Sequence, residues 1–300
     1  MGNFLPPIVA SDEFPFFKLN LTPSLDEIDF EDDLSSGVIP KNTTFEQYMS
    51  NKRKKEGSPP VKVIITCFGA FGGIPSNPTL SIVKTSTPNI STLLTSHPCP
   101  NTILKTFSLN VSSKSVSSQM SSIFTSDILP HPGPVLLLHT GVDGTQNPPG
   151  KFKLERLAYN ETDFRIPDND GYQPSHLPIS SSFGPKESYL CSMSLPSSTS
   201  PSSRKVDSVL NKLREKGWDD LVIPSDDAGR FVCNYTLFTS LLKAKEVYER
   251  REGEVWAGFL HVPGFELVEE EVQVRFLRDC VMAMVEEIEG REGGEYMGPP

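Results

Sequence analysis

The chain has 300 residues, 37% of them hydrophobic, which is enough to build one large domain or two small ones. Its formal net charge of −10 argues against nucleic acids and anionic membrane surfaces as partners, because an acidic protein repels both. No apolar run reaches the ~18–20 residues that span a bilayer, and the N-terminus does not resemble a secretory signal. We therefore expect a soluble, cytoplasmic protein.

The five cysteines are widely spaced, and none belongs to a Cys-x-x-Cys pair. The odd number and the spacing argue against a disulfide framework and against a zinc site. The cysteines are Cys67, Cys99, Cys191, Cys233 and Cys280.

Residues 1–60 are expected to form an N-terminal extension. They include an acidic stretch at 26–33 and a highly charged stretch at 51–56, without a long amphipathic period. Such a composition favours partial disorder, and a docking segment is the alternative. The core is expected over residues 61–290, with 291–300 as a C-terminal tail.

Strands and helices alternate in the predicted core. Short apolar runs rich in β-branched residues predict strands at Val61–Thr66, Val135–His139, Leu221–Pro224 and Val255–Val262. Apolar residues at helical spacing predict helices at Val206–Lys216, Val232–Arg250 and Val272–Ile288. This alternation predicts a layered α/β fold.

Two stretches rich in serine and proline are expected to interrupt the pattern. Thr85–Pro100 is the first, and Ser175–Ser203 is the second. We interpret the second as a surface loop around a short strand near Tyr189–Met193.

The segment SDDAGRFVCNY, residues 225–235, is the first candidate for chemistry. A predicted strand ends just before it, polar residues follow, and Cys233 falls in the first turn or two of the next helix. Unpaired N–H groups and the positive end of the helix dipole favour a nucleophilic thiolate there. A buried structural cysteine is the alternative.

His261 is the second candidate, at the end of the apolar run in GFLHVP. Pro263 stops this strand, and the carboxyl ends of strands line the functional crevice of an open α/β sheet. A histidine there can accept a thiol proton and later protonate a leaving amine. A hydrogen-bonded structural histidine is the alternative.

A carboxylate that orients the histidine is expected in LERLAYN or the following FRIPDNDG. The residues alone do not choose among Glu155, Glu161, Asp163 and Asp168.

A glycine-rich loop, TCFGAFGGIPSNP, follows the first predicted strand and carries Phe68 and Phe71. It contains neither a Walker motif nor GxGxxG, but it could present aromatic faces to a small flat ligand. A tight turn with both phenylalanines in the core is the alternative.

Together, these four segments resemble pyroglutamyl peptidase I, a family of cysteine peptidases. SDDAGRFVCNY is similar to its nucleophile segment, GFLHVP to its histidine segment, LERLAYN with FRIPDNDGYQP to its glutamate segment, and TCFGAFGGIPSNPT to its N-terminal loop. The order of the segments also fits, and the similarity spans roughly Val61 to Ile288.

The resemblance implies a single three-layer α/β/α domain with a mixed central sheet, of the phosphorylase and hydrolase type, without metal or cofactor. It implies Cys233 as nucleophile, His261 as base and Glu155 as the group that orients the histidine. The implied reaction removes an N-terminal pyroglutamyl residue from a peptide through a thioester.

The resemblance also implies substrate-binding residues. Phe68 and Phe71 match an aromatic clamp on the pyroglutamyl ring, and Arg165 matches an arginine close to the site. Val142 falls where some bacterial members place a glutamine that reads the lactam, so ring recognition here is expected to rest on backbone groups.

The chain departs from the family pattern in two loops. Cys67 and the pair Gly69-Ala70 replace residues of the usual Thr-Gly-Phe-x-Pro-Phe, and Thr145–Lys151 looks a few residues longer than usual.

Two other functions fit parts of the sequence. An inactive protein of the same fold could bind pyroglutamyl peptides or a partner, but such proteins commonly lose one catalytic residue. A nucleoside phosphorylase shares the layered architecture, but no phosphate loop is recognisable and a thiol at a helix start does not suit it.

Overall fold

The computed structural model describes residues 31–36, 38, 40–41, 59–73, 77–96, 102–145, 147–193, 203–250 and 252–289. The chain divides into two compact units, Met1–Tyr48 and Met49–Pro300. The described part of the first unit includes a short helix at residues 31–35. Most of the predicted extension and all of the predicted tail lie outside the described residues.

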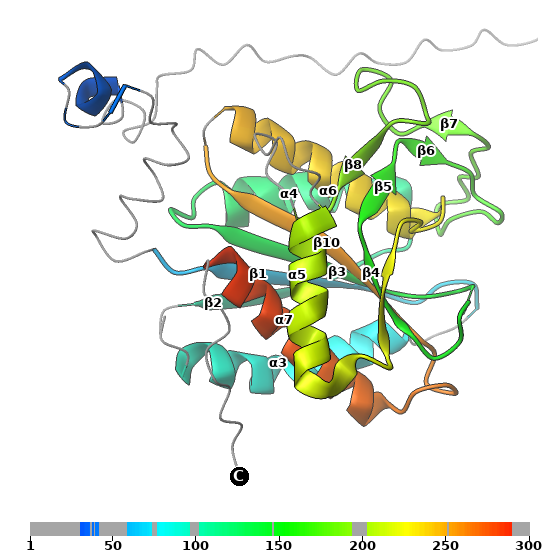
Figure 1. The fold of residues 1–300 in the computed structure, drawn as a ribbon. Coiled ribbons are helices and arrows are strands. Elements are labelled where there is room, and N and C mark those ends of the chain that lie inside the picture. The colour runs from blue at the N-terminus through cyan, green and yellow to red at the C-terminus, as the bar shows by residue number, and fades with distance from the viewer. Residues whose placement is uncertain are drawn as a thin grey trace, which may run out of the picture. The chain divides into compact units, whose positions relative to one another are not determined.

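A six-stranded sheet forms the centre of the second unit, in the order β2-β1-β3-β10-β4-β9 (Figure 1). Strands β1, β2, β3 and β10 are parallel, whereas β4 is antiparallel to β10 and parallel to β9. The mixed sheet expected from the sequence is therefore confirmed. The strands are β1 (Lys62–Phe68), β2 (Ile103–Leu109), β3 (Val135–Val142), β4 (Phe152–Glu155), β9 (Val222–Ser225) and β10 (Val255–Val262).

Helices cover both faces of this sheet, which confirms the three-layer architecture (Figure 1). On one face lie α3 (Pro78–Ser96), α5 (Ser203–Leu213) and α7 (Glu270–Ile288). On the other lie α4 (Ser113–Ile123) and α6 (Val232–Glu249). Two single π-helical turns, η1 (Phe124–Ile128) and η2 (Arg214–Trp218), follow α4 and α5.

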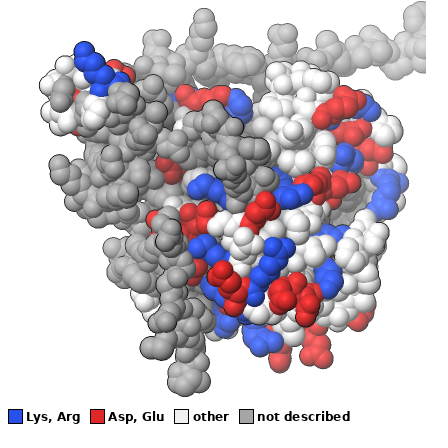
Figure 2. Space-filling view, in the orientation of Figure 1, with Lys and Arg blue, Asp and Glu red and all other residues white. Residues whose placement is uncertain are grey.

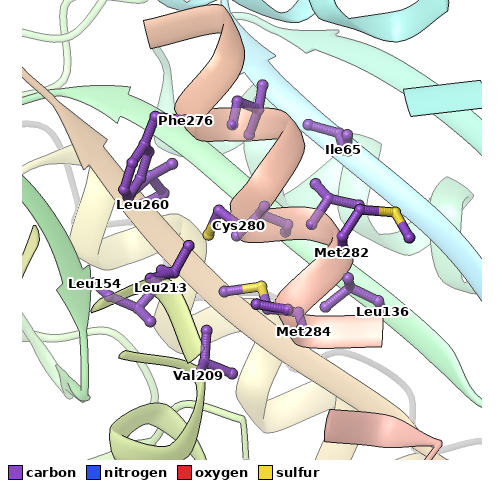
Figure 3. Packing of buried hydrophobic residues seen from close by; sticks show 14 of the residues in the cluster. Ile65, Leu136, Leu154, Val209, Leu213, Leu260, Phe276, Cys280, Met282 and Met284 are labelled. Carbon is purple, nitrogen blue, oxygen red and sulfur yellow. The ribbon is translucent and has the colours of Figure 1, made fainter. Parts of the chain in front are cut away.

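The larger apolar cluster lies on the face of the sheet that α3, α5 and α7 cover, which we call the α7 face. Phe276, Cys280 and Met284 recur every four residues along α7, so they share one side of the helix. In Figure 3 they lie over Leu136 and Leu260 of the sheet, in the same buried cluster. Burying such side chains stabilises the fold by roughly 1.5–3 kcal/mol each.

The first predicted interruption is wrong, because α3 continues through Thr85 to Ser96. Its buried face includes Ile82, Ile90 and Leu94, at helical spacing. The hydroxyl of Ser86 donates back to the Ile82 carbonyl (2.7 Å), so a residue that usually competes with helix structure is satisfied within it. Packing of this apolar face outweighs the low helix propensity that the composition indicated.

Residues 157–191 form an arm of two small antiparallel sheets. Strand β5 (Leu157–Tyr159) pairs with β8 (Tyr189–Cys191), and β6 (Glu161–Thr162) pairs with β7 (Leu177–Pro178). The short strand expected near Tyr189 is therefore confirmed, and residues 194–202 of that stretch lie outside the described residues.

No helix in the described ranges is both long and apolar enough to cross a membrane. On the face of the molecule in Figure 2, basic and acidic side chains are interspersed rather than segregated into patches of one sign.

His139 in the middle of the sheet is a buried, neutral histidine. Its Nδ1 lies 2.7 Å from Thr66 Oγ1 and its Nε2 2.9 Å from Ser240 Oγ. The Ser240 hydroxyl donates to the Leu237 carbonyl, so it accepts from Nε2–H. Burial lowers the pKa of His139 to about 3, so a proton is excluded from this ring throughout the neutral range.

His139 is therefore expected to make the protein acid-sensitive. Between about pH 6.5 and about pH 3 the unfolded chain binds a proton at this ring and the folded chain does not, so stability falls with pH by about 1.4 kcal/mol per unit. Urea unfolding of the wild type and of His139→Gln from pH 7 to pH 4 measures the contribution of this histidine to the pH dependence of stability. The two stability curves should converge as pH falls, and parallel curves would contradict the assignment.

Candidate active site

The loop 226–231 delivers Cys233 to the first turn of α6. Asp227 Oδ1 accepts the N–H of Gly229 at 3.0 Å, and Gly229 has a φ of 77°, which glycine adopts without strain. Phe231 then caps the helix in an extended conformation, and α6 begins at Val232. Cys233 is thus the second residue of the helix, where first-turn N–H groups lack helical partners.

Glu155 and His261 are brought together by the antiparallel pairing of β4 with β10. His261 lies opposite Lys153, and Glu155 follows two residues later, so both face the same side of the sheet. The Nδ1 of His261 is 2.7 Å from Oε1 of Glu155. Glu155 is fully buried and His261 is 7% exposed, so water weakens this pair little.

Cys233 lies beside His261, because its Sγ would be 3.1 Å from a Cβ on Gly141, the residue paired with His261 across the sheet. Burial alone would lower the pKa of His261, but the neighbouring Cys233 and then Glu155 outweigh it and raise the pKa to about 10. The imidazole can therefore stay protonated between Cys233 and Glu155. That arrangement supplies a nucleophile and an acid in one place.

The other three carboxylates that the sequence offered lie elsewhere. Glu161 pairs with His176, Lys186 and Arg230. Asp168 accepts the backbone N–H of Ser113 at 2.9 Å and so satisfies the start of α4. Asp163 accepts from Ser175 at 3.3 Å.

The glycine-rich loop lies close to the start of α6. Phe68 is 3% exposed, and its ring centroid is 6.5 Å from that of Phe259. Phe68 therefore lies in the core, as expected for a tight turn rather than for an aromatic clamp. Phe71 is half-buried, with its ring 5.2 Å from that of Phe231. Of the two rings, Phe71 is therefore the more available to a ligand.

Asn169, in the turn after β6, holds this loop in place. Its Nδ2 donates to the Ala70 carbonyl at 3.0 Å and to Asn110 Oδ1 at 2.6 Å. The FRIPDNDG segment thus holds the glycine-rich loop by a hydrogen bond, although the carboxylate that contacts His261 comes from Glu155 instead.

Val142 and Arg165 are not brought into contact with the cysteine and histidine. Val142 ends β3, and its side chain packs against the apolar cluster of the α7 face, away from α6. Arg165 is exposed beside Phe164, whose ring contacts Phe231 at 4.7 Å.

Two residues near the thiol were missed by the sequence reasoning. Gly141 pairs with His261 across the sheet, and a Cβ there would lie 2.8 Å from the Phe259 ring and 3.1 Å from Cys233 Sγ. Asn234 is fully buried, and its side chain bonds the N–H (2.8 Å) and carbonyl (2.9 Å) of Tyr159. In the sequence, Gly141 could have been noticed as a glycine near the end of an apolar strand, where another group often approaches closely. Asn234 could have been noticed as an amide next to the candidate cysteine in a predicted helix.

Comparison with known proteins agrees with this geometry. A profile described as pyroglutamyl peptidase matches residues 61–271. The chain belongs to the pyroglutamyl peptidase family. This confirms the resemblance of the four segments and the expected class, a cysteine-type peptidase of that family.

Individual members of the family are distant relatives. A pyrrolidone-carboxylate peptidase from Streptococcus suis is 30% identical over 206 residues, which cover 68% of this chain and 78% of the relative. One from Thermococcus litoralis is 31% identical, covering 67% and 76%. The crystal structure of pyrrolidone carboxyl peptidase from Thermus thermophilus aligns with a TM-score of 0.54 and 28% identity, covering 73% of this chain and 98% of that one.

Proposed function

We propose that this chain removes an N-terminal pyroglutamyl residue from peptides, with Cys233 as nucleophile, His261 as base and acid, and Glu155 as the group that orients the histidine. The observation that carries the proposal is that Cys233 lies beside His261, whose Nδ1 is hydrogen-bonded to the buried Glu155. The names of the relatives, pyrrolidone-carboxylate peptidases, support the choice of substrate.

In the proposed reaction, the Cys233 thiolate attacks the carbonyl carbon of the peptide bond that follows the pyroglutamyl ring, not the carbonyl of the lactam. The C–N bond then breaks, and the His261 imidazolium donates its proton to the leaving amine, which gives a thioester. A water molecule loses a proton to His261 and attacks the thioester, and pyroglutamate leaves as the thiolate is restored. Glu155 holds the imidazole by its Nδ1–H throughout.

The developing oxyanion is proposed to lie at the start of α6. First-turn N–H groups of a helix have no helical acceptors, and the dipole places partial positive charge there. Donors that are fixed before the reaction stabilise an oxyanion strongly. The same helix turn would thus support both the thiolate and the transition state.

The two alternative functions are less well supported. An inactive binding protein would not need the complete Cys233–His261–Glu155 arrangement. A nucleoside phosphorylase is at odds with membership of a peptidase family.

The cytoplasmic location stays a prediction.

Hydrolysis of a pyroglutamyl-linked chromogenic amide tests the proposal. The matched control is the prolyl amide of the same chromophore, which has the ring but no lactam carbonyl. We expect turnover of the first only, lost after iodoacetamide treatment, with the label on Cys233. Cys67 should stay unlabelled because burial raises its pKa to about 11. A folded protein without turnover that still binds pyroglutamyl peptides would favour the inactive alternative.

Phe71 is proposed to cover one face of the pyroglutamyl ring. Phe71→Ala is expected to raise KM by about 5–30-fold with little change in kcat, since aromatic contact contributes about 1–2 kcal/mol and is lost equally in substrate and transition state. Phe107→Ala, which removes another half-buried phenylalanine of the same cluster, is the control. Equal KM values in both variants would exclude Phe71 from the binding site.

A further inference from the structure

A buried ion pair lies beside His261, and the mechanism above does not use it. Lys153 Nζ is 2.6 Å from Asp143 Oδ2, and the two side chains are 10% and 8% exposed. Thr145 donates its N–H (2.9 Å) and its hydroxyl (2.6 Å) to Asp143 Oδ1. Both oxygens of this carboxylate are therefore bonded.

The register of the sheet places this pair next to the histidine. Lys153 is the residue of β4 directly opposite His261, and Gly141 is the residue of β3 on the other side. Because side chains alternate, Asp143 shares the face of Gly141, and its N–H donates to the Val262 carbonyl at 2.9 Å. The pair thus crosses β10 just beyond His261.

Lysine at this place has an electrostatic consequence. Lys153 and His261 are directly opposed, so their side chains share one face of the sheet, and an uncompensated ammonium on β4 would oppose a proton on His261. Asp143 compensates that charge. Burial alone would raise the pKa of Asp143, but hydrogen bonds from Lys153 and Thr145 hold it below its usual range, so the carboxylate remains charged.

We propose that Asp143 and Lys153 form a positioning pair for His261, in which Asp143 neutralises the lysine so that the neighbouring imidazole keeps its proton. The pair also links the end of β3 to β4. This inference rests on the proposed role of His261. Neither residue is proposed to touch the substrate.

Other charged groups around His261 do not replace this compensation. The stretch 263–268 after β10 adds Glu266, which is exposed. The titratable side chains on the described elements that share this face around His261 are Cys233 of α6, Glu155 and Lys153 of β4, and Asp143 after β3.

The test is the pH dependence of the rate at which iodoacetamide alkylates Cys233, together with the pH profile of kcat/KM. In Asp143→Asn the free lysine charge favours proton loss from the Cys233–His261 pair, so both profiles should shift by about one to two units to lower pH. Lys153→Met should shift them to higher pH. The double variant should lie within about half a unit of the wild type, since it leaves neither charge behind.

The matched control is Asp127→Asn, which breaks another buried pair. Asp127 and Lys62 are each 9% exposed, and Lys62 pairs with Val135 at the opposite end of β3. This variant should lose stability without a shift in either profile. If Asp143→Asn does not fold, the upward shift in Lys153→Met decides the question.

Unshifted profiles in the soluble single variants, with stability losses like that of Asp127→Asn, would overturn the proposal and leave a structural ion pair. Alkylation needs no substrate, so it reports on this pair even if the pyroglutamyl amide is not hydrolysed.

Discussion

Cys233→Ala is expected to lower kcat/KM for a pyroglutamyl amide by at least about three orders of magnitude, because no other side chain at the site can form the thioester. His261→Ala should be nearly as damaging, since both the base and the acid are lost. Glu155→Gln should be milder, on the order of 10²–10⁴-fold, because the amide can still accept from Nδ1–H but carries no charge. Steady-state kinetics with active-site titration measure all three.

Non-additivity is the sharper result. If the three residues act as one unit, Cys233→Ala/His261→Ala should be no slower than Cys233→Ala alone. Asp163→Asn is the control for Glu155→Gln, since Asp163 lies away from His261. Full activity in Glu155→Gln combined with a large loss in Asp163→Asn would show that the carboxylate has been assigned wrongly.

Gly141→Ala is expected to lower kcat by up to about 10²-fold, although alanine is a small residue. Its Cβ would lie 2.8 Å from the Phe259 ring and 3.1 Å from Cys233 Sγ, so the ring must shift and the thiol must give by a few tenths of an ångström. Displacement of a reacting atom by about 1 Å costs about 10²-fold in rate, which sets the upper limit here, whereas overpacking costs about 1–3 kcal/mol of stability. Kinetics and urea unfolding of the same variant separate the two effects.

Gly258→Ala provides the control on the neighbouring strand. There the added Cβ would meet Met193 at 3.5 Å, an ordinary contact. A similar loss of kcat in both variants would mean that Gly141 matters for the sheet in general rather than for the thiol.

Much of the fold could be predicted because its strands are continuous apolar runs. The run Val255–Val262 matches β10 residue for residue, and the predicted helix at Val232–Arg250 is α6 with one residue fewer. Strand β4 was not predicted, because Phe-Lys-Leu-Glu is short and half charged, and only burial between β10 and β9 makes it a strand.

The site could be predicted only in part, because its geometry depends on long-range pairing. Cys233 and His261 stand at recognisable positions, at a helix start and a strand end. The choice of Glu155 among the four carboxylates needs the register of β4 against β10, which local sequence does not contain. The role of Gly141 likewise needs the position of a side chain from α6.

The alternation of side chains along β4 protects the site from changes in loop length. Phe152 and Leu154 belong to the apolar cluster of the α7 face, whereas Lys153 and Glu155 face His261. A slip of one residue would bury a carboxylate and an ammonium among apolar side chains, at a cost of several kcal/mol. A change in the length of the segment between β3 and β4 is therefore not expected to shift β4 by one residue, because such a slip would turn Glu155 away from His261.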